Sequence, residues 1–386
     1  MKEVKFGRKI LMVMYNFLSD PVKFIRIFIY FSLLLRRGVG MEKVDTATCV
    51  HVDVDISEQE LCKKISDFPK LNFVHIDHSS WGCEENSSII DISRDNSEVR
   101  SKLIALANAG FHLYVVRNGI SSLVHHRRIS TLWHPAVIGN VKVDENSIFY
   151  TVQKAKGNGE AKLLVVFSSI AGEMYTPSLI RHFEKNFSTI DKYIPQNINI
   201  LRIVDFGSVV GSFYLNSHAL PNNEENIWNC IKTCAKKLNV KQDNIVLYGT
   251  SKGGTATVFY ALKHGVRGVA VDPILSDDHY VRVYDDLHFT QGTFPESKER
   301  KFFNLSEREL LPESKLSVIC STRSPQYPYI EKMLMKHEKN ILILNTENNE
   351  IHKHPDVAPK SLPHTLSQIN LHLAGLDNPK GYYTVW

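Results

Sequence analysis

A short run near the middle of the chain has the residue types of a serine nucleophile. The sequence GTSKG at residues 249–253 fits the pattern G-x-S-x-G, with Ser251 at its centre. The apolar run Ile245–Tyr248 before it predicts a buried strand, and residues 255–263 after it predict a helix. Strand, sharp turn and helix are the context in which this pattern forms a nucleophile elbow, so we expect the Ser251 hydroxyl to stand at the top of a sheet.

The residues that flank Ser251 fit this interpretation. A Cβ at Gly249 or Gly253 would collide with neighbouring chain in such a turn. The backbone N–H of Lys252, at the start of the predicted helix, would point to the place where an oxyanion forms. We expect the Lys252 side chain to be solvated, and a contact with an anionic substrate is the alternative.

A serine nucleophile needs a second oxyanion donor, and a loop further up the chain could supply it. That donor normally follows the third strand of such a fold, which is here the loop of residues 167–172. The small residues of this loop allow a close approach to the N–H of Lys252. The backbone N–H of Ser169 is the candidate donor, with Ile170 as the alternative.

The general base is expected to be a histidine after the last strand. Three histidines, His352, His354 and His364, fall within thirteen positions of that region. His354 is the favoured base, His352 comes second and His364 is a further alternative.

The catalytic acid is the least defined member of the predicted group. It normally follows the seventh strand, but residues 320–327 contain no carboxylate. Asp272, which follows the preceding strand, is the best substitute, and it could equally be a turn residue before Pro273. Asp277, Asp278 and Asp356 are the other candidates, and a Ser–His dyad without an acid is also open.

Strands and helices alternate from about residue 140 onward. Continuous apolar strands interleaved with helices predict an α/β fold with a mostly parallel sheet covered by helices on both faces, and together with the elbow at Ser251 this sheet resembles that of an α/β hydrolase. The strands are expected at residues 147–152, 163–167, 197–204, 245–248, 266–271, 316–320 and 341–344, with a helix at 224–238. We therefore expect an α/β-hydrolase-like domain over residues 140–386.

Residues 45–135 predict a small N-terminal α/β module. Strands are expected at 49–56, 71–76 and 111–116, and a helix at 99–109. Histidines gather at residues 75–78 and 125–128, but neither group has a recognisable ligand spacing, so scattered surface or core histidines and no metal are expected, with a metal or anion site as the alternative. The module could help to bind a larger substrate.

The amino-acid composition limits which binding partners and which cellular compartment are expected. The net charge is +5, and residues 1–40 carry eight Lys and Arg against two acids, so the remainder is close to neutral. That distribution argues against nucleic-acid binding. The six dispersed cysteines include no zinc-type pair and predict reduced thiols in the cytoplasm.

Residues 1–40 mix apolar and basic side chains. The uninterrupted apolar part, Ile27 to Leu35, is too short to cross a membrane, and Arg36 and Arg37 follow where a signal peptide would need a cleavage site. This pattern predicts a segment lying on an anionic membrane surface, with packing against a protein as the alternative.

Four stretches of the sequence carry a resemblance to a known family: the elbow, the strand and loop at 165–169, the Val271-Asp272-Pro273 step and the histidine-rich tail. They resemble α/β-hydrolase-fold proteins of bacterial capsule loci, in particular the XcbB/CpsF family of capsular polysaccharide biosynthesis proteins. The resemblance implies a cytoplasmic protein at the inner face of the plasma membrane, working beside other capsule-synthesis enzymes. Related capsule proteins of this fold transfer acetyl groups to sugar hydroxyls.

Three functions remain open at this stage. The main hypothesis is O-acetylation of a capsular polysaccharide or its precursor through an acyl-Ser251 intermediate, with acetyl-CoA as the possible donor and no metal. The same residues could instead make a carbohydrate or thioester esterase. A non-catalytic capsule-assembly protein on a hydrolase fold is the third.

Overall fold

The computed structural model describes residues 48–82, 87–307 and 315–386. All described helices and strands belong to one compact unit, Cys49–Trp386. The basic segment predicted at residues 1–40 lies outside the described residues. Within the described part of the chain, every helix is too short or too polar to pass through a bilayer.

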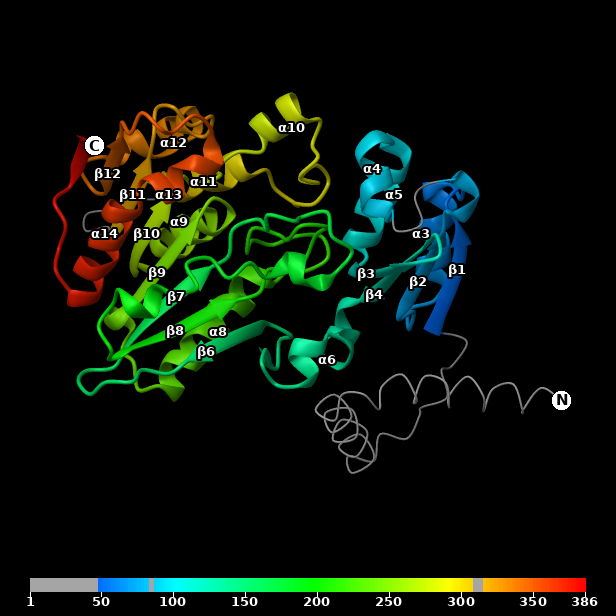
Figure 1. The fold of residues 1–386 in the computed structure, drawn as a ribbon, viewed down its shortest axis with the longest axis horizontal. Helices are drawn as coiled ribbons and strands as arrows, with labels where there is room; N and C mark the ends of the chain where they lie inside the picture. Colours follow the sequence, from blue (N-terminus) through cyan, green and yellow to red (C-terminus); the bar gives the residue numbers. More distant parts are fainter. Residues whose placement is uncertain (1–47, 83–86, 308–314) are drawn as a thin grey trace, which may run out of the picture. The chain divides into compact units, whose positions relative to one another are not determined.

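A large, mostly parallel sheet dominates residues 140–386 (Figure 1). Its nine described strands lie in the order β13-β12-β11-β10-β9-β7-β8-β6-β5. Neighbours from β13 to β8 are parallel, whereas β6 runs antiparallel to β8 and β5 antiparallel to β6. The strands are β5 (Lys142–Val143), β6 (Phe149–Gln153), β7 (Lys162–Phe167), β8 (Ile198–Ile203), β9 (Ile245–Thr250), β10 (Arg267–Val271), β11 (Leu316–Cys320), β12 (Leu342–Thr346) and β13 (Gly381–Val385).

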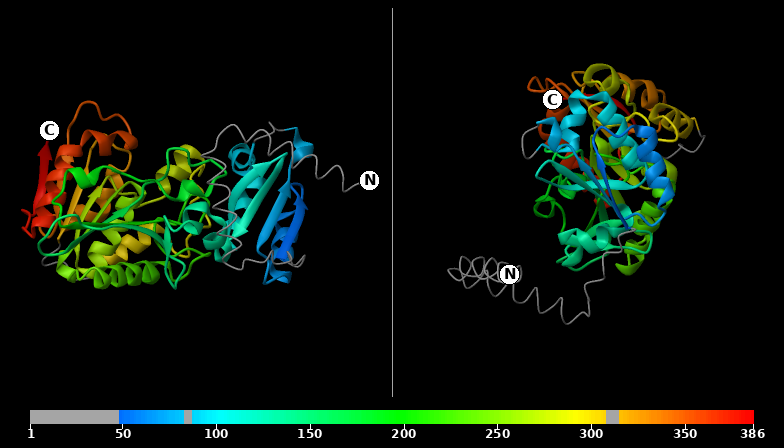
Figure 2. Two further views of the ribbon diagram at one scale, coloured as in Figure 1. Left: turned by 60° about the horizontal axis from the view of Figure 1, so that its bottom comes forward. Right: turned by 90° about the vertical axis from the view of Figure 1, so that its right-hand side faces the viewer.

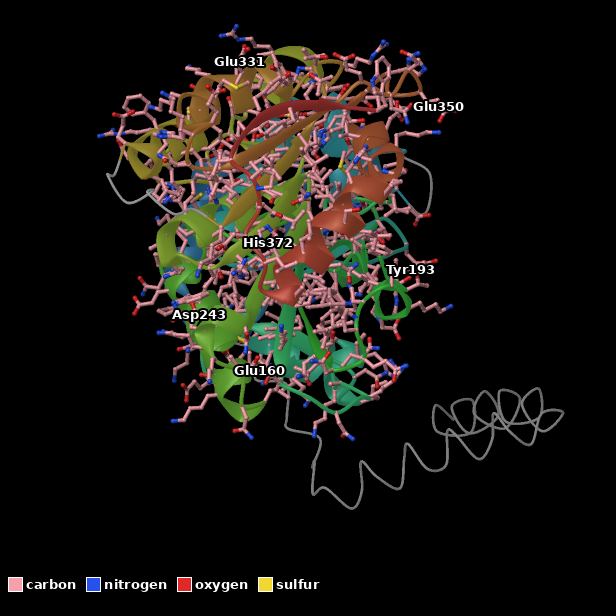
Figure 3. The ribbon with its side chains drawn as sticks, turned by 90° about the vertical axis from the view of Figure 1, so that its left-hand side faces the viewer. Glu160, Tyr193, Asp243, Glu331, Glu350 and His372 are labelled. Atoms are coloured by element: carbon pink, nitrogen blue, oxygen red, sulfur yellow. The ribbon has the colours of Figure 1, made fainter. Side chains whose placement is uncertain are left out.

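Helices cover both faces of this sheet. One core forms where α8, α9, α11 and α12 pack on one face, and a second forms where α13 and α14 pack on the other (Figure 1). His372 of α14, labelled in Figure 3, lies 2.9 Å from the hydroxyl of Ser317 in β11. The helices are α8 (Asn223–Lys237), α9 (Lys252–His264), α10 (Asp278–Tyr284), α11 (Lys298–Ser306), α12 (Tyr327–Leu334), α13 (His354–Lys360) and α14 (Leu362–Ala374).

A second sheet of four strands forms the N-terminal module, coloured blue to cyan in Figure 2. Its order is β1-β2-β4-β3, with β1 and β2 parallel and the other pairs antiparallel. The elements are β1 (Cys49–Asp53), α3 (Glu58–Asp67), β2 (Phe73–Asp77), α4 (Ile89–Asp95), α5 (Ser97–Asn108), β3 (Phe111–Arg117), β4 (Ile120–His125), α6 (Ile129–Leu132) and α7 (His134–Val137).

The predicted fold class is confirmed: the chain is α/β, with a mostly parallel sheet between two helical layers and a smaller α/β module. The sequence analysis missed β13, which pairs with β12 at the edge, and β4, which completes the small sheet. Val124 and Ile129 of the module share an apolar cluster with Phe149 and Phe206 of the large domain. The domain boundary near residue 140 stays a prediction.

Candidate active site

Ser251 occupies a strained turn between β9 and α9. Its backbone has φ 54° and ψ −119°, a conformation that residues other than glycine rarely adopt. A Cβ on Gly249 would overlap the carbonyl oxygen of Gly253, and one on Gly253 would overlap that of Phe167. The N–H of Ser251 donates to the carbonyl of Val271, 2.9 Å away, which ties the turn to the neighbouring strand. The turn therefore has the geometry of a nucleophile elbow.

His354 joins Ser251 to Asp272 in one chain of hydrogen bonds. Its Nε2 lies 2.8 Å from the Ser251 hydroxyl oxygen, and its Nδ1 lies 2.7 Å from Oδ2 of Asp272. Because an ionised carboxylate only accepts, Nδ1 carries the proton, and Nε2 of the neutral ring accepts from the serine hydroxyl. The three residues follow one another as serine, acid and histidine, which is the chain order of α/β hydrolases.

Asp272 lies at the carboxyl end of β10 and is 2% exposed. Its backbone has a positive φ of 43°, and its N–H donates to the carbonyl of Ile319. The hydroxyl of Ser324 donates to the same carboxylate oxygen that His354 contacts, at 2.5 Å. The catalytic acid normally lies in the loop after β11. Here that loop instead supplies Ser324, which donates a hydrogen bond to the Asp272 carboxylate at the end of the neighbouring strand β10.

The other predicted bases lie away from this chain of hydrogen bonds. His352 is exposed, and its backbone N–H donates to the carboxylate of Asp356 at the start of α13. Nε2 of His364 lies 2.7 Å from the carbonyl oxygen of Trp386. Of the three candidate histidines, the structure brings His354 to Ser251.

The alternative acids have other partners. The carboxylate of Asp277 forms an ion pair with Lys298, and that of Asp278 accepts from the hydroxyl of Tyr329. Asp356 accepts the backbone N–H groups that precede α13. Asp272 is the candidate whose carboxylate contacts His354.

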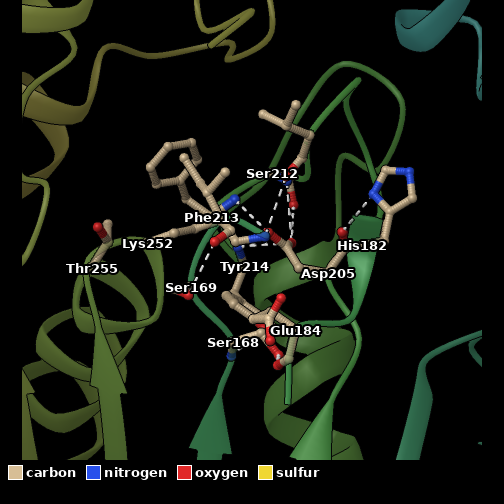
Figure 4. Close-up of polar contacts among 12 residues, drawn as sticks. Ser168, Ser169, His182, Glu184, Asp205, Ser212, Phe213, Tyr214, Lys252 and Thr255 are labelled. Carbon is tan, nitrogen blue, oxygen red and sulfur yellow. Dashed lines mark hydrogen bonds and ion pairs between the residues drawn. The ribbon is translucent and has the colours of Figure 1, made fainter. Parts of the chain in front are cut away.

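Lys252 is buried, so the prediction of a solvated side chain is wrong. Its ammonium lies 2.9 Å from Oδ2 of Asp205, and both side chains are completely buried. Figure 4 shows the ion pair among the polar groups that surround it. The Lys252 ammonium therefore has its partner inside the protein. This placement also excludes the alternative prediction, a contact between the ammonium and an anionic substrate.

Asp205 organises the loop that follows β8. Its carboxylate accepts the backbone N–H groups of Ser212, Phe213 and Tyr214 (Figure 4). The hydroxyl of Tyr214 in turn accepts from the N–H of Ser168, at the carboxyl end of β7. The sequence analysis missed Asp205, whose only signal is a carboxylate directly after a buried apolar strand.

The two candidate second oxyanion donors differ in their hydrogen bonds. The N–H of Ser169 donates to the side-chain oxygen of Asn186, 2.5 Å away, and the Asn186 amide donates back to the Ser169 hydroxyl. The N–H of Ile170 has no protein partner within the described residues, and Ile170 also lines the cavity at Ser251. Asn186 would have to move for Ser169 to act as the donor.

A cavity of about 440 Å³ opens at Ser251 and His354. Apolar residues such as Ile170, Val271 and Pro355 line it together with His288. Burial lowers the pKa of His288 to about 4, so its ring is neutral near pH 7. Among the described residues, the lining includes no lysine or arginine. The cavity suits a neutral group.

Comparisons with known proteins give distant likenesses. No protein-family model matches the chain, and no curated protein matches it. The chain is similar to solved structures of an S-formylglutathione hydrolase from Agrobacterium tumefaciens (10% identity, 61% of this chain and 94% of that chain, TM-score 0.45) and the fluorophosphonate-binding serine hydrolase F of Staphylococcus aureus (11%, 58% and 96%, 0.41). It is also similar to the capsule O-acetyltransferase of Neisseria meningitidis serogroup A (13%, 60% and 93%, 0.42).

Proposed function

We propose that this chain is a serine-type acyl transferase. The observation that carries the proposal is the hydrogen-bonded chain from the Ser251 hydroxyl through His354 to Asp272, placed at a strained elbow. A serine hydroxyl is a weak nucleophile, and an adjacent base held by a third group is the arrangement that activates it. The buried carboxylate of Asp272 is well placed to stabilise the imidazolium that forms when His354 takes the proton.

The reaction proceeds in two steps with one covalent intermediate. Ser251 Oγ attacks the acyl carbonyl while His354 Nε2 takes its proton, and the N–H groups of Lys252 and Ile170 stabilise the oxyanion. His354 then protonates the leaving group, which departs and leaves an acyl-serine. In the second step His354 takes a proton from the acceptor hydroxyl as that oxygen attacks the acyl carbonyl. The bond between the acyl carbon and Ser251 Oγ then breaks, and His354 returns the proton to Oγ, which restores Ser251.

The acceptor in this proposal is a sugar hydroxyl of a bacterial capsular polysaccharide or its precursor, and the acyl donor is acetyl-CoA. The resemblance of the elbow, the 165–169 loop and the Val271-Asp272-Pro273 step to capsule-locus proteins supports the acceptor class. The described residues that line the cavity include no lysine or arginine, which suits an acetyl group and a neutral sugar, so the phosphates of acetyl-CoA would lie outside the cavity.

Residues 1–40 set the location in the same proposal. Their basic and apolar side chains would hold the protein at the cytoplasmic face of the plasma membrane. The resemblance to capsule-locus proteins adds other capsule-synthesis enzymes as partners there. Deleting residues 1–40 should move the protein from the membrane pellet to the supernatant at physiological salt. An unchanged distribution would remove this part of the proposal.

The fate of the acyl group distinguishes transfer from hydrolysis. Wild type and Ser251→Ala are given acetyl-CoA with and without capsular oligosaccharide, and acetylated sugar and free acetate are measured by mass spectrometry. Transfer predicts acetylated sugar from wild type only. Acetate alone, whether or not the sugar is present, would establish the esterase instead.

The non-catalytic alternative has its own test. It drew support from the missing carboxylate after β11, but Asp272 contacts His354 from the end of β10. A Ser251→Ala strain that makes a normal capsule would establish an assembly role. Loss of capsule O-acetyl groups in that strain, with the polymer still present, is the result that acyl transfer predicts.

A further inference from the structure

One face of the small sheet brings three metal-ligating side chains together. Cys49 and His51 lie on β1, and His75 lies on the paired strand β2. Figure 1 shows the two strands side by side in the small sheet. The Cys49 sulfur and one ring nitrogen of each histidine all lie within 4.8 Å of one another. Tetrahedral zinc, with bonds of about 2.0–2.3 Å, needs ligand atoms roughly 3.5 Å apart, so small side-chain rotations would complete the geometry.

The strand pairing explains why these residues meet. Side chains two apart on a strand share a face, which places Cys49 and His51 on the same side of β1. The parallel register sets His51 directly opposite His75. Val52 and Val74, on the other face, are buried in the core under α3 and α5. The three ligands therefore lie on the face away from that core, with His51 exposed and the other two partly buried.

A hydrogen bond outside the cluster orients one of the ligands. Nδ1 of His75 lies 2.7 Å from the hydroxyl of Ser122 on β4. That contact orients the ring and leaves Nε2 to bind a metal, because a hydrogen bond to the other ring nitrogen fixes the orientation of a metal-bound histidine. The His51 ring stacks on the His75 ring with centroids 4.5 Å apart, so both rings are held side by side.

We propose that Cys49, His51 and His75 form a binding site for one Zn²⁺ ion. A thiolate with two imidazoles is a donor set that suits zinc, and three protein ligands leave the fourth position for water or an external ligand. Binding releases the thiol proton of Cys49. The ion would tie the edge strand β1 to β2, a role separate from the acyl transfer proposed for Ser251.

The spacing of these three residues in the sequence gives no indication of a metal site. Cys49 and His51 make only a C-x-H pair, and His75 follows 24 residues later, so no zinc motif is present and the sequence analysis expected no metal. The three side chains come close together only because β1 pairs with β2 in the folded sheet.

The test measures metal binding by the untagged full-length chain. Zn²⁺ affinity is determined by competition with a chromophoric chelator, and Co²⁺ is added separately to look for a thiolate-to-cobalt charge-transfer band. Wild type should bind one ion and show the band. Cys49→Ser should abolish the band, and His51→Ala and His75→Ala should each weaken Zn²⁺ binding at least tenfold. Ser122→Ala should weaken it about 10–100-fold, as loss of an outer-shell partner does.

Matched controls separate this site from adventitious binding. Cys62→Ser changes an exposed cysteine on α3, and His352→Ala changes an exposed histidine, so both should bind like wild type. Circular dichroism of each variant establishes that it is folded. The proposal is overturned if wild type binds no zinc, or if folded Cys49→Ser keeps the cobalt band and the zinc affinity.

Discussion

Lys252 and Asp205 form a completely buried ion pair, with 2.9 Å between Nζ of Lys252 and Oδ2 of Asp205. Lys252 is the residue after Ser251, and Asp205 holds the loop that follows β8 through three backbone N–H groups. The pair thus connects the elbow to that loop. Tyr214 extends the connection to Ser168, beside the proposed oxyanion donors. The backbone around Ser251 is therefore fixed by a network of buried polar contacts.

Breaking this ion pair should destabilise the fold. Lys252→Met leaves the Asp205 carboxylate buried without its cation, and such changes cost about 3–5 kcal/mol. Urea unfolding should show this loss, and Asp205→Asn should behave similarly. Lys241→Met, which changes an exposed lysine, is the control and should leave the midpoint nearly unchanged. A Lys252→Met variant as stable as wild type would contradict the structural role of the pair.

His354 and His352 should differ sharply in their effect on activity. His354→Gln removes the group that contacts the Ser251 hydroxyl, so kcat should fall by about 10³-fold or more, whereas exposed His352→Gln should remain near wild type. Steady-state hydrolysis of an activated acetyl ester measures both. Equal losses in the two variants would show that the base has been assigned to the wrong residue.

Ser324 should matter because its hydroxyl holds the carboxylate that orients His354. Ser324→Ala removes a hydrogen bond to a charged group, worth about 1.5–3 kcal/mol, and kcat should fall roughly tenfold or more. Ser324→Thr keeps the hydroxyl and should recover most of the activity. The same kinetic assay tests both variants. Comparable rates for Ser324→Ala and wild type would mean that Asp272 needs no such support.

The partly buried His126 should make the fold sensitive to acid. Burial lowers its pKa to about 4, against about 6.5 in an unfolded chain. The unfolded state therefore binds the proton first, so stability is full above pH 6.5 and falls as the pH drops toward 4, by about 3 kcal/mol for this residue. Urea unfolding at pH 7.5 and pH 4.5 measures the loss, and His126→Phe should show a smaller one. An identical loss in both proteins would rule out His126 as a source.

Much of the fold could be predicted from the sequence because buried parallel strands are continuous apolar runs. Residues 163–167 are such a run and form a strand within one residue of the prediction. Residues 316–320, apolar except for Ser317, form a strand with the predicted bounds. By contrast, β13 was missed because its sequence, GYYTV, lies at a sheet edge with little burial and no apolar run. Local pattern therefore locates interior strands better than edge strands.

The site was predictable where chemistry is local in sequence and less so where it depends on distant contacts. The strained turn at Ser251 follows from its glycines, which have no Cβ to collide. The burial of the Lys252 side chain could not be predicted, because its partner Asp205 is 47 positions away and no local sequence pattern indicates a buried ion pair. The role of Ser324 was equally hidden, since a serine in a loop has no signal until Asp272 is seen beside it.

Covalent labelling tests the activation of Ser251 most directly. Wild type and Ser251→Ala are treated with a serine-directed fluorophosphonate and analysed by intact-protein mass spectrometry, followed by peptide mapping. The account predicts one adduct on wild type, mapped to Ser251, and none on Ser251→Ala. An unlabelled wild type under conditions that label a control hydrolase, or an adduct that persists in Ser251→Ala, would contradict it.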